Sequence, residues 1–335
     1  MTISELKDNI MILKDSVRSA ILQNPLLQDA GSVDMARKAV RHIGLRGIDK
    51  IIIGKPNTLI IVTNDTIVKM PMDRLSTARC RLNKMMLKKL CKTGISSFVP
   101  RFLKEGRFDG QPYYCETRLP GAAIDIPLNR MDELVIKAAD FITEFHKETA
   151  QEITIDEIYF KRLFAKSIVK LSYYLKGEYK EKLLRLEKML KKRLIGKRLK
   201  TVWFHGDYKV ENVLFDKKHW GIRGVIDWDL SRERGLPLLD IFYLLLYRDS
   251  MLTGKDTSEI FADRFLKLDF VGLEREIIAE YINITAINSE FIRPMLLMYW
   301  INHLIERYRK QFENNTTDLI CNDLYGIIDK IAEIK

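Results

Sequence analysis

The sequence predicts an α+β fold in two lobes, a small antiparallel β-sheet lobe followed by a larger lobe that is mainly helical. One observation behind this prediction is a set of β-branched runs, separated by short turns, before residue 118. Another is the mostly helical spacing of apolar residues after it. We therefore expect a helical extension at 1–47, the β-sheet lobe at 48–118 and the helical lobe at 119–335.

The elements of the β-sheet lobe can be placed one by one. "KIIIG", "TLIIVT" and "TIVKM" are predicted strands, because the turn residues "KPN" and "ND" separate them. "RLSTARCRLNKMMLKKL" is a predicted helix, and "VPRFLKEGRFDGQPYYCETRL" contains two further strands joined by a glycine turn. The apolar face expected for the helix consists of Leu75, Ala78, Leu82, Met85, Met86 and Leu90.

Composition narrows the class of protein. The 335 residues, 47% of them hydrophobic, can bury a large core, and no apolar run approaches the roughly 18 residues of a membrane-spanning helix. The four cysteines lie far apart, which is typical of reduced thiols, so we expect a cytoplasmic protein. The net charge of +11 indicates anionic partners, among which nucleotide phosphates, membrane surfaces and nucleic acid remain open.

The stretch that carries chemistry is "WFHGDYKVENVLFDKKHWGIRGVIDWD", residues 203–229. An apolar strand ends on Asp207, and two short apolar runs separated by "KKHWGI" predict a β-hairpin. Hairpin pairing would bring Asn212, before its first strand, close to Asp227, after its second. Two carboxylates and an amide oxygen would then converge as one base and an oxygen pair suited to Mg²⁺.

Asp207, Asn212 and Asp227 follow the spacing of a kinase catalytic loop, D-x-x-x-x-N and then a metal-binding aspartate. "HGDYKVENVLFD", "GVIDWD" and "GLPLLD" together resemble the aminoglycoside phosphotransferase and choline kinase group of small-molecule kinases. The resemblance extends from Gly54 to Tyr247. It implies a bilobal protein-kinase-like fold and a transfer of the γ-phosphate of ATP or GTP, with Mg²⁺, to a hydroxyl group.

The resemblance also implies roles by position. Asp207 would be the catalytic base, and Asn212 and Asp227 would hold Mg²⁺ against the nucleotide phosphates. Lys209 would neutralise the transferred phosphoryl group, because "DYKVEN" is similar to the "DLKPEN" of protein kinases; an ordinary surface lysine is the alternative. Three nearby residues are interpreted as structural, namely His205 in the loop, Asp216 in the hairpin turn and Asp240 at a helix start.

In the β-sheet lobe, the resemblance implies a nucleotide site. Lys69 in "TIVKMP" would contact the α- and β-phosphates. Gly54 and Asn57 would belong to the phosphate-covering turn "GKPN", whose backbone amides can bind phosphate oxygens. The main chain around Glu116 and Arg118 would pair with the edge of the purine.

One position departs from the kinase pattern. Kinases pair the strand lysine with a glutamate of the following helix, and the corresponding residue here is Asn83. The segment 74–92 contains seven Lys/Arg and no acidic residue. Either Asn83 accepts a hydrogen bond from Lys69 in place of the glutamate, or the lysine has an acid elsewhere, or activity is weak. The alternative function is therefore a pseudokinase, a nucleotide-binding module with little or no catalysis.

The sequence also restricts the partners. Only 12 residues separate Asp227 from Asp240, too few for the activation segment of a protein kinase, so we expect a small-molecule acceptor: a sugar, an aminoglycoside or an amino alcohol. Residues 180–200 hold ten Lys/Arg and two Glu, for which a solvated helix face and contact with an anionic surface are both open. No nucleic-acid partner is expected. Candidate acceptor-pocket residues, with core packing as the alternative, are Tyr299, Trp300, His303 and Glu306.

Overall fold

The computed structural model describes residues 30–54, 56–121, 127–175, 177–307 and 328. The chain divides into two compact units. The first takes the residues up to Pro127 together with Glu211–Ser231, and the second takes Leu128–Val210 and the residues from Arg232 onward. Of the helical extension predicted at 1–47, residues 1–29 lie outside the described residues, and the helix α2 (Ala30–Ile43) lies within the rest. The hairpin segment thus belongs to the first unit, although the sequence analysis grouped it with the helical lobe.

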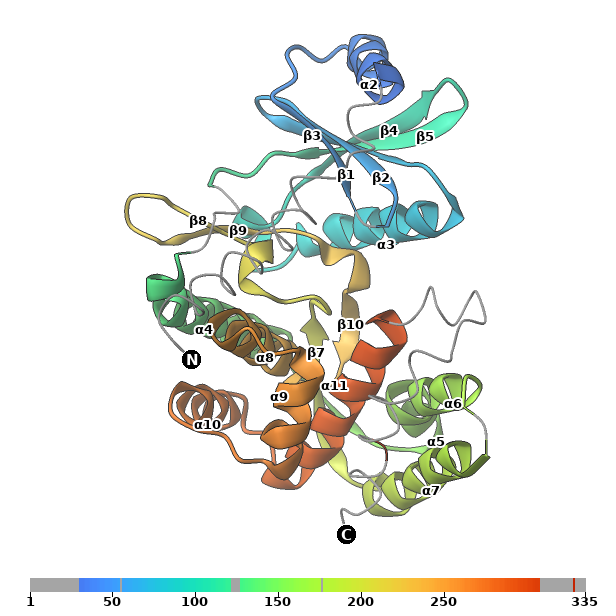
Figure 1. The fold of residues 1–335 in the computed structure, drawn as a ribbon, viewed down its shortest axis with the longest axis vertical. Helices are drawn as coiled ribbons and strands as arrows, with labels where there is room; N and C mark the ends of the chain where they lie inside the picture. Colours follow the sequence, from blue (N-terminus) through green and yellow to red (C-terminus); the bar gives the residue numbers. More distant parts are fainter. Residues whose placement is uncertain (1–29, 55, 122–126, 176, 308–327, 329–335) are drawn as a thin grey trace. The chain divides into compact units, whose positions relative to one another are not determined.

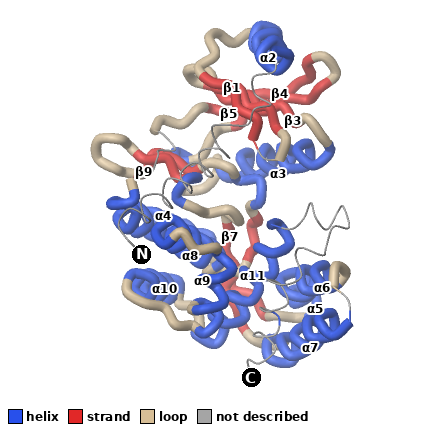
Figure 2. Tube along the Cα trace, in the orientation of Figure 1, coloured by secondary structure: helices blue, strands red, loops and turns tan. Residues whose placement is uncertain are grey.

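The first unit is built on a five-stranded sheet in the order β1-β2-β3-β5-β4, antiparallel throughout. The predicted strands are confirmed, and the sheet lies between the helices α2 and α3 (Figure 1). Figure 2 shows the same layering by secondary structure. The strands are β1 (Lys50–Gly54), β2 (Thr58–Val62), β3 (Thr66–Pro71), β4 (Phe102–Phe108) and β5 (Gln111–Thr117).

The two faces of this sheet have different chemistry, because side chains alternate along each strand. Val68 and Met70 of β3 point into an apolar core shared with α2 (Ala30–Ile43), which buries Ala36 and Ala39 there. The intervening residues Ile67 and Lys69 therefore face the other side of the sheet, where α3 (Arg74–Leu90) lies.

Helix α3 buries a different face from the one predicted. Asp73 caps it, accepting a hydrogen bond from the Ser76 amide, while the Ser76 hydroxyl receives one from the Asp73 amide. Leu82 and Met85, expected on the apolar face, are 42% and 41% exposed. The apolar stripe was therefore wrong in part, because the helix turns polar residues toward the sheet. The buried residues are Ser76, Cys80, Asn83, Met86, Leu87 and Leu90.

The predicted hairpin forms in the first unit. β8 (Val213–Phe215) pairs antiparallel with β9 (Ile222–Val225), and Val213 lies opposite Val225. Asp216 stabilises the turn by accepting hydrogen bonds from the amides of Lys218 and His219, at 2.9 and 2.8 Å. These bonds hold the pKa of Asp216 at about 2, below its ordinary value.

The second unit is mainly helical, around a three-stranded antiparallel sheet in the order β10-β7-β6. Its strands are β6 (Gln151–Thr154), β7 (Arg198–Phe204) and β10 (Arg232–Gly235). Its α-helices are α4 (Met131–Thr149), α5 (Glu157–Phe160), α6 (Lys166–Ser172), α7 (Gly177–Leu194), α8 (Leu239–Thr253), α9 (Thr257–Asp263), α10 (Leu273–Thr285) and α11 (Ile292–Arg307). Among the described residues, none of the helices is both long and apolar enough to cross a membrane.

Half of the ten basic residues at 180–200, for which a solvated face and contact with an anionic surface were both open, are paired with acidic side chains. Helix α7 buries Leu183, Leu186 and Leu190, so its basic residues lie on the opposite side. The pairs are Lys182–Glu178, Arg185–Glu181, Lys191–Glu157, Lys197–Glu290 and Arg198–Glu152. The local positive charge is therefore smaller than the sequence count suggests.

Candidate functional site

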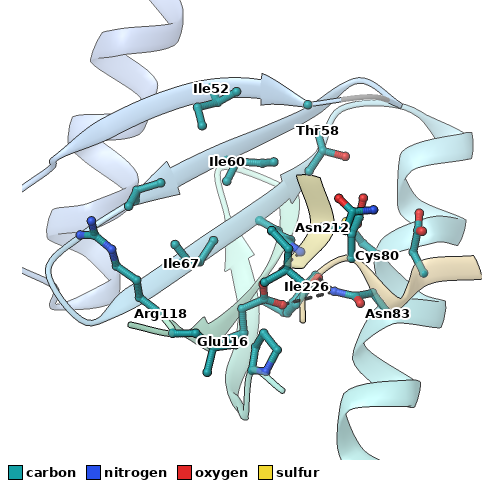
Figure 3. Close-up of a pocket in the computed structure, with 18 of the residues that line it drawn as sticks. Ile52, Thr58, Ile60, Ile67, Cys80, Asn83, Glu116, Arg118, Asn212 and Ile226 are labelled. Atoms are coloured by element: carbon teal, nitrogen blue, oxygen red, sulfur yellow. Dashed lines mark hydrogen bonds and ion pairs between the residues drawn. The ribbon is translucent and has the colours of Figure 1, made fainter. Parts of the chain in front are cut away.

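The first unit contains a cavity of about 460 Å³ on the side of its sheet where α3 lies (Figure 3). Apolar side chains from β1 and β2, such as Ile52 and Ile60, form one wall, and Leu214 and Ile226 of the hairpin line it as well. Such a slot with apolar walls and a few converging polar groups is typical of small-molecule and cofactor sites. Its charged lining residues are Lys69, Arg79, Glu116, Arg118, Asp227 and Asp229.

An ion pair between neighbouring strands lies in the wall of this cavity. Lys69 lies opposite Tyr114 in the β3–β5 ladder, and Glu116 is two residues further along β5, on the same face. The Lys69 Nζ and Glu116 Oε1 atoms are 3.0 Å apart, with exposed fractions of 13% and 3%. Burial alone would lower the pKa of Lys69, but the negative charge and hydrogen bond of Glu116, together with Tyr114 and Asp227, outweigh burial and raise that pKa well above its ordinary value. Lys69 is therefore a fixed cation.

Asn83 contacts the acid and not the lysine. Its Nδ2 donates hydrogen bonds to the Tyr114 hydroxyl at 2.6 Å and to Glu116 Oε2 at 3.2 Å, and Figure 3 shows Asn83 and Glu116 facing each other. Its Oδ1 has no hydrogen-bond partner among the residues that the structure describes. Of the alternatives left open by the sequence, the structure therefore favours an acid elsewhere, Glu116, as the partner of Lys69. Sequence reasoning gave only the main chain of Glu116 a role.

The other predicted nucleotide-site residues are spread along the rim of the cavity. Gly54 lines it, whereas Asn57 is exposed and its side chain bonds Asp73 at the start of α3. Lys55, between them, lies outside the described residues. Arg118 also lines the cavity, but its backbone amide donates to Asp65 O at 2.8 Å. A purine edge at this point must therefore use other main-chain groups.

The hairpin brings Asn212 and Asp227 together. The amide of Ile226 donates to Asn212 O at 2.9 Å, which fixes the residue before Asp227 beside Asn212. Asp227 has a φ of 69°, a left-handed conformation uncommon for residues other than glycine and often found at functional sites. Both residues line the cavity.

These two oxygen donors fit one particular kind of metal site. Mg²⁺ is commonly held by one or two carboxylates together with substrate phosphates and water. Within the described ranges, no three His, Cys, Asp or Glu residues converge as a metal-binding cage. Asp227 and Asn212 thus suit a cation that arrives with a phosphate-bearing ligand, not one held by protein ligands alone.

One contact of the cavity wall was missed by the sequence analysis. Arg79 of α3 lies 3.6 Å from Asp229, and the two side chains are 13% and 15% exposed. Arg79 is one helical turn before Asn83, so both residues lie on the side of α3 that faces the cavity. The pair connects α3 to the short helix Trp228–Leu230 that follows Asp227. No sequence spacing links these two residues, which lie in segments far apart.

In the second unit, the loop that carries Asp207 is attached to a buried carboxylate. Asp240, at the start of α8 and 1% exposed, accepts hydrogen bonds from the His205 amide at 2.7 Å and the Gly206 amide at 2.9 Å. His146 of α4 contributes its Nε2 at 3.2 Å. Burial raises the pKa of Asp240, but the hydrogen bond and the charge of His146 outweigh burial and lower it. Asp240 thus does more than start a helix.

Side chains of α4 and α10 complete this attachment. His146 Nδ1 lies 2.7 Å from the Tyr281 hydroxyl, and the imidazole is fully buried. The Asp207 amide donates to His205 Nδ1 at 3.2 Å, consistent with the bracing interpretation of His205. His146 and Tyr281 were missed by sequence reasoning because both look like core residues of amphipathic helices.

The Asp207 carboxylate faces aromatic residues of α8 and α11. Burial and the charge of Asp207 raise the pKa of Tyr243, whose hydroxyl hydrogen-bonds Asp207. Burial and the same charge raise the pKa of Tyr299. The Lys209 Nζ lies 5.5 Å from the centre of the Tyr247 ring. Of the residues proposed for the acceptor, Tyr299 lies next to the Asp207 charge, whereas Trp300 stacks on Phe261 at 4.1 Å in the core.

Comparison with known proteins places this chain in a family. Residues 55–279 match the phosphotransferase enzyme family, which covers well over half of the chain. A search of curated proteins gave no match. The family match includes the Asp207 loop, the hairpin and α8.

Solved structures show the same fold at low sequence identity. A mutant of aminoglycoside 2'-phosphotransferase-IIIa in complex with GDP has a TM-score of 0.57 and 14% identity, covering 90% of this chain and 97% of its own. A thermostable mutant of aminoglycoside phosphotransferase APH(4)-Ia, in a ternary complex with ADP and hygromycin B, has a TM-score of 0.58 and 10% identity, covering 90% and 99%. APH(3'')-Id from Streptomyces rimosus, with ADP and streptomycin, gives 0.52 and 15%, covering 80% and 98%.

Proposed function

The chain belongs to the phosphotransferase enzyme family, and we propose that it transfers the γ-phosphate of ATP or GTP, with Mg²⁺, to a hydroxyl group of a small molecule. The observation that supports this most is the cavity wall that joins the buried Lys69–Glu116 pair to Asn212 and Asp227. A fixed cation and a pair of oxygen donors around one apolar slot suit a nucleotide and its phosphates. The nucleotides in the similar structures, GDP and ADP, are consistent with this proposal.

Each charged group has a task in phosphoryl transfer, which depends on positioning and charge stabilisation. Lys69 would bind phosphate oxygens, and Asn212 and Asp227 would hold Mg²⁺, which neutralises charge on the phosphates. Asp207 would accept the proton of the attacking hydroxyl. Lys209, two residues later, would stabilise the transferred group. Gly54 and Asn57 would shape the turn near the phosphates, while the main chain near Glu116 and Arg118 would bind the base.

The acceptor is proposed only by class. Aminoglycosides are present in two of the similar structures, as hygromycin B and streptomycin. The aromatic residues Tyr243 and Tyr299 near Asp207 suit a hydroxylated ring or an amino alcohol.

The test is a transfer assay with the full chain, labelled ATP or GTP and a panel of sugars, aminoglycosides and amino alcohols, with and without Mg²⁺. Phosphorylation of one acceptor class that requires Mg²⁺ is the expected result. The pseudokinase alternative predicts nucleotide binding without transfer to any acceptor. Absence of both binding and transfer would contradict the two functions together.

Contact of the basic segment with an anionic surface is a separate proposal. Lys188, Lys192 and Arg193 are exposed on α7. If they dock on a membrane, vesicles with acidic lipid should bind the protein at low salt and release it at about 0.5 M salt, because the attraction decays over a Debye length of roughly 10 Å at 0.1 M. Changing these three residues to glutamate should abolish binding and leave transfer to a soluble acceptor intact. If the wild-type protein does not bind such vesicles even at low salt, the basic residues form only a solvated helix face.

A further inference from the structure

The acid that pairs with Lys69 comes from a strand of the sheet. Helix α3 has no acidic residue to offer, since residues 74–92 contain none. Glu116 on β5 reaches Lys69 instead, across two neighbouring strands, and its carboxylate is 3% exposed. A buried carboxylate at this position needs a reason, because an ion pair removed from water gains little net stability over apolar packing.

Both oxygens of the Glu116 carboxylate are engaged. Oε1 lies 3.0 Å from Lys69 Nζ, and Oε2 accepts the hydrogen bond of Asn83 at 3.2 Å. Asn83 is fixed in turn by the Tyr114 hydroxyl at 2.6 Å. The carboxylate is therefore held by Asn83 through one oxygen, and its other oxygen directs the amine of Lys69. Asn83 supports the acid and does not itself substitute for it.

We propose that Glu116 is the positioning residue for Lys69, and that Asn83 orients Glu116, so that the β-sheet itself holds the phosphate-binding lysine in place. This inference rests on the proposed function, because it assumes that Lys69 binds a nucleotide phosphate. Glu116 acts through the lysine and contacts no phosphate. It keeps Lys69 protonated and its amine directed along the cavity wall in the absence of nucleotide.

The experiment measures binding of a fluorescent ATP analogue to the full chain with Mg²⁺, alongside thermal unfolding of each variant. Glu116→Gln keeps the shape but removes the charge, and we expect its affinity for the analogue to fall about tenfold, as for a lost charge-assisted contact. The matched control is Glu105→Gln on the adjacent strand β4, which removes an exposed glutamate that pairs with Lys84 and should leave affinity unchanged.

Relocating the charge gives the sharper test. Asn83 and Glu116 are within hydrogen-bond distance of each other, so an acid at position 83 has the length to approach Lys69. The double variant Asn83→Glu with Glu116→Gln should regain most of the lost affinity. A purely structural role for Glu116 predicts no such rescue. A folded double variant that binds no better than Glu116→Gln alone would contradict the proposal.

If Glu116→Gln does not fold, the proposal can still be tested in variants that lack Lys69. Lys69→Met combined with Glu116→Gln removes both charges, and a neutral pair is tolerated in a buried site better than one unpaired charge. This double variant should bind the analogue as weakly as Lys69→Met alone. A further loss would mean that Glu116 contacts the nucleotide directly, which overturns the positioning role. Wild-type protein that does not bind the analogue would refute the proposed function and not this inference alone.

Discussion

The two units hold their candidate functional groups in different ways. In the first, Lys69 is positioned by direct contact with an opposite charge on the neighbouring strand, at 3.0 Å. In the second, Asp207 is positioned through its backbone, because Asp240 accepts hydrogen bonds from the two residues before it. A side chain that is paired directly keeps its place by electrostatics. A side chain on an attached loop keeps its place by the geometry of the loop, which suits the proton transfer proposed for Asp207.

The difference predicts that changes in the second unit alter turnover and changes in the first alter nucleotide affinity. Asp207→Asn should show the largest effect. It removes the proposed proton acceptor, so turnover should fall by about three orders of magnitude, within the range of general-base catalysis. Affinity for the nucleotide should stay within about twofold, as measured by titration with a fluorescent ATP analogue. A variant that retains near wild-type turnover on its true acceptor would show that Asp207 is not the base.

Asp240→Asn should affect both stability and turnover. The amide offers one acceptor oxygen where the carboxylate has two, so one buried N–H is left unpaired, which costs about 2–3 kcal/mol of unfolding free energy. The displaced loop should lower turnover by about 100-fold. Because the pKa of Asp240 is lowered in the folded state, its contribution is present above about pH 3.9 and is lost as pH falls below that. Denaturant unfolding of both proteins against pH should show a larger acid-dependent loss in the wild type than in the variant, in which other carboxylates such as Asp216 still contribute.

Asp227→Asn tests the proposed Mg²⁺ site in the first unit. Replacing the carboxylate weakens the only charged oxygen donor of the proposed Mg²⁺ pair. The affinity gained on adding Mg²⁺ should therefore fall about tenfold, equivalent to about 1.4 kcal/mol. Titrations with and without Mg²⁺ measure the difference, and metal-free binding should change little. Equal Mg²⁺ dependence in the variant and the wild type would remove Asp227 from the metal site.

Tyr243→Phe should give the smallest effect. Burial and the charge of Asp207 raise the pKa of Tyr243, so the hydroxyl stays protonated near neutral pH and donates to the carboxylate. Removing this donor takes away one hydrogen bond that holds the Asp207 carboxylate in position. Turnover at neutral pH should fall roughly threefold to tenfold, about the value of one hydrogen bond. Tyr247→Phe is the matched control, and unchanged turnover in Tyr243→Phe would argue against the contact.

The sequence predicted what depends on local patterns. The strands at 50–54, 58–63 and 66–70 and the helix at 74–90 were placed almost to the residue, because turn residues separate the strands and apolar residues recur at helical spacing. The hairpin that joins Asn212 to Asp227 was also predictable, since pairing follows from two short runs and one turn.

What the sequence did not predict depends on contacts between distant segments. The Lys69–Glu116 pair requires the strand order β3-β5, which skips β4 and cannot be inferred from spacing. The polar buried face of α3 had the same cause: Asn83 is turned inward by Glu116 and Tyr114, not by its own helical pattern. His146, Tyr281 and the Arg79–Asp229 contact likewise join elements that are remote in the chain.

The location of Glu116 on β5 has a consequence for regulation. A kinase that takes this acid from a helix can be switched off by rotating the helix, because the lysine then loses its partner. Here the lysine and its acid belong to one hydrogen-bonded sheet, and they separate only if the strands do. An outward movement of α3 would remove the support of Asn83 but leave the ion pair in place. If Lys69 binds the nucleotide as proposed, a movement of α3 would therefore not by itself separate the lysine from its acid.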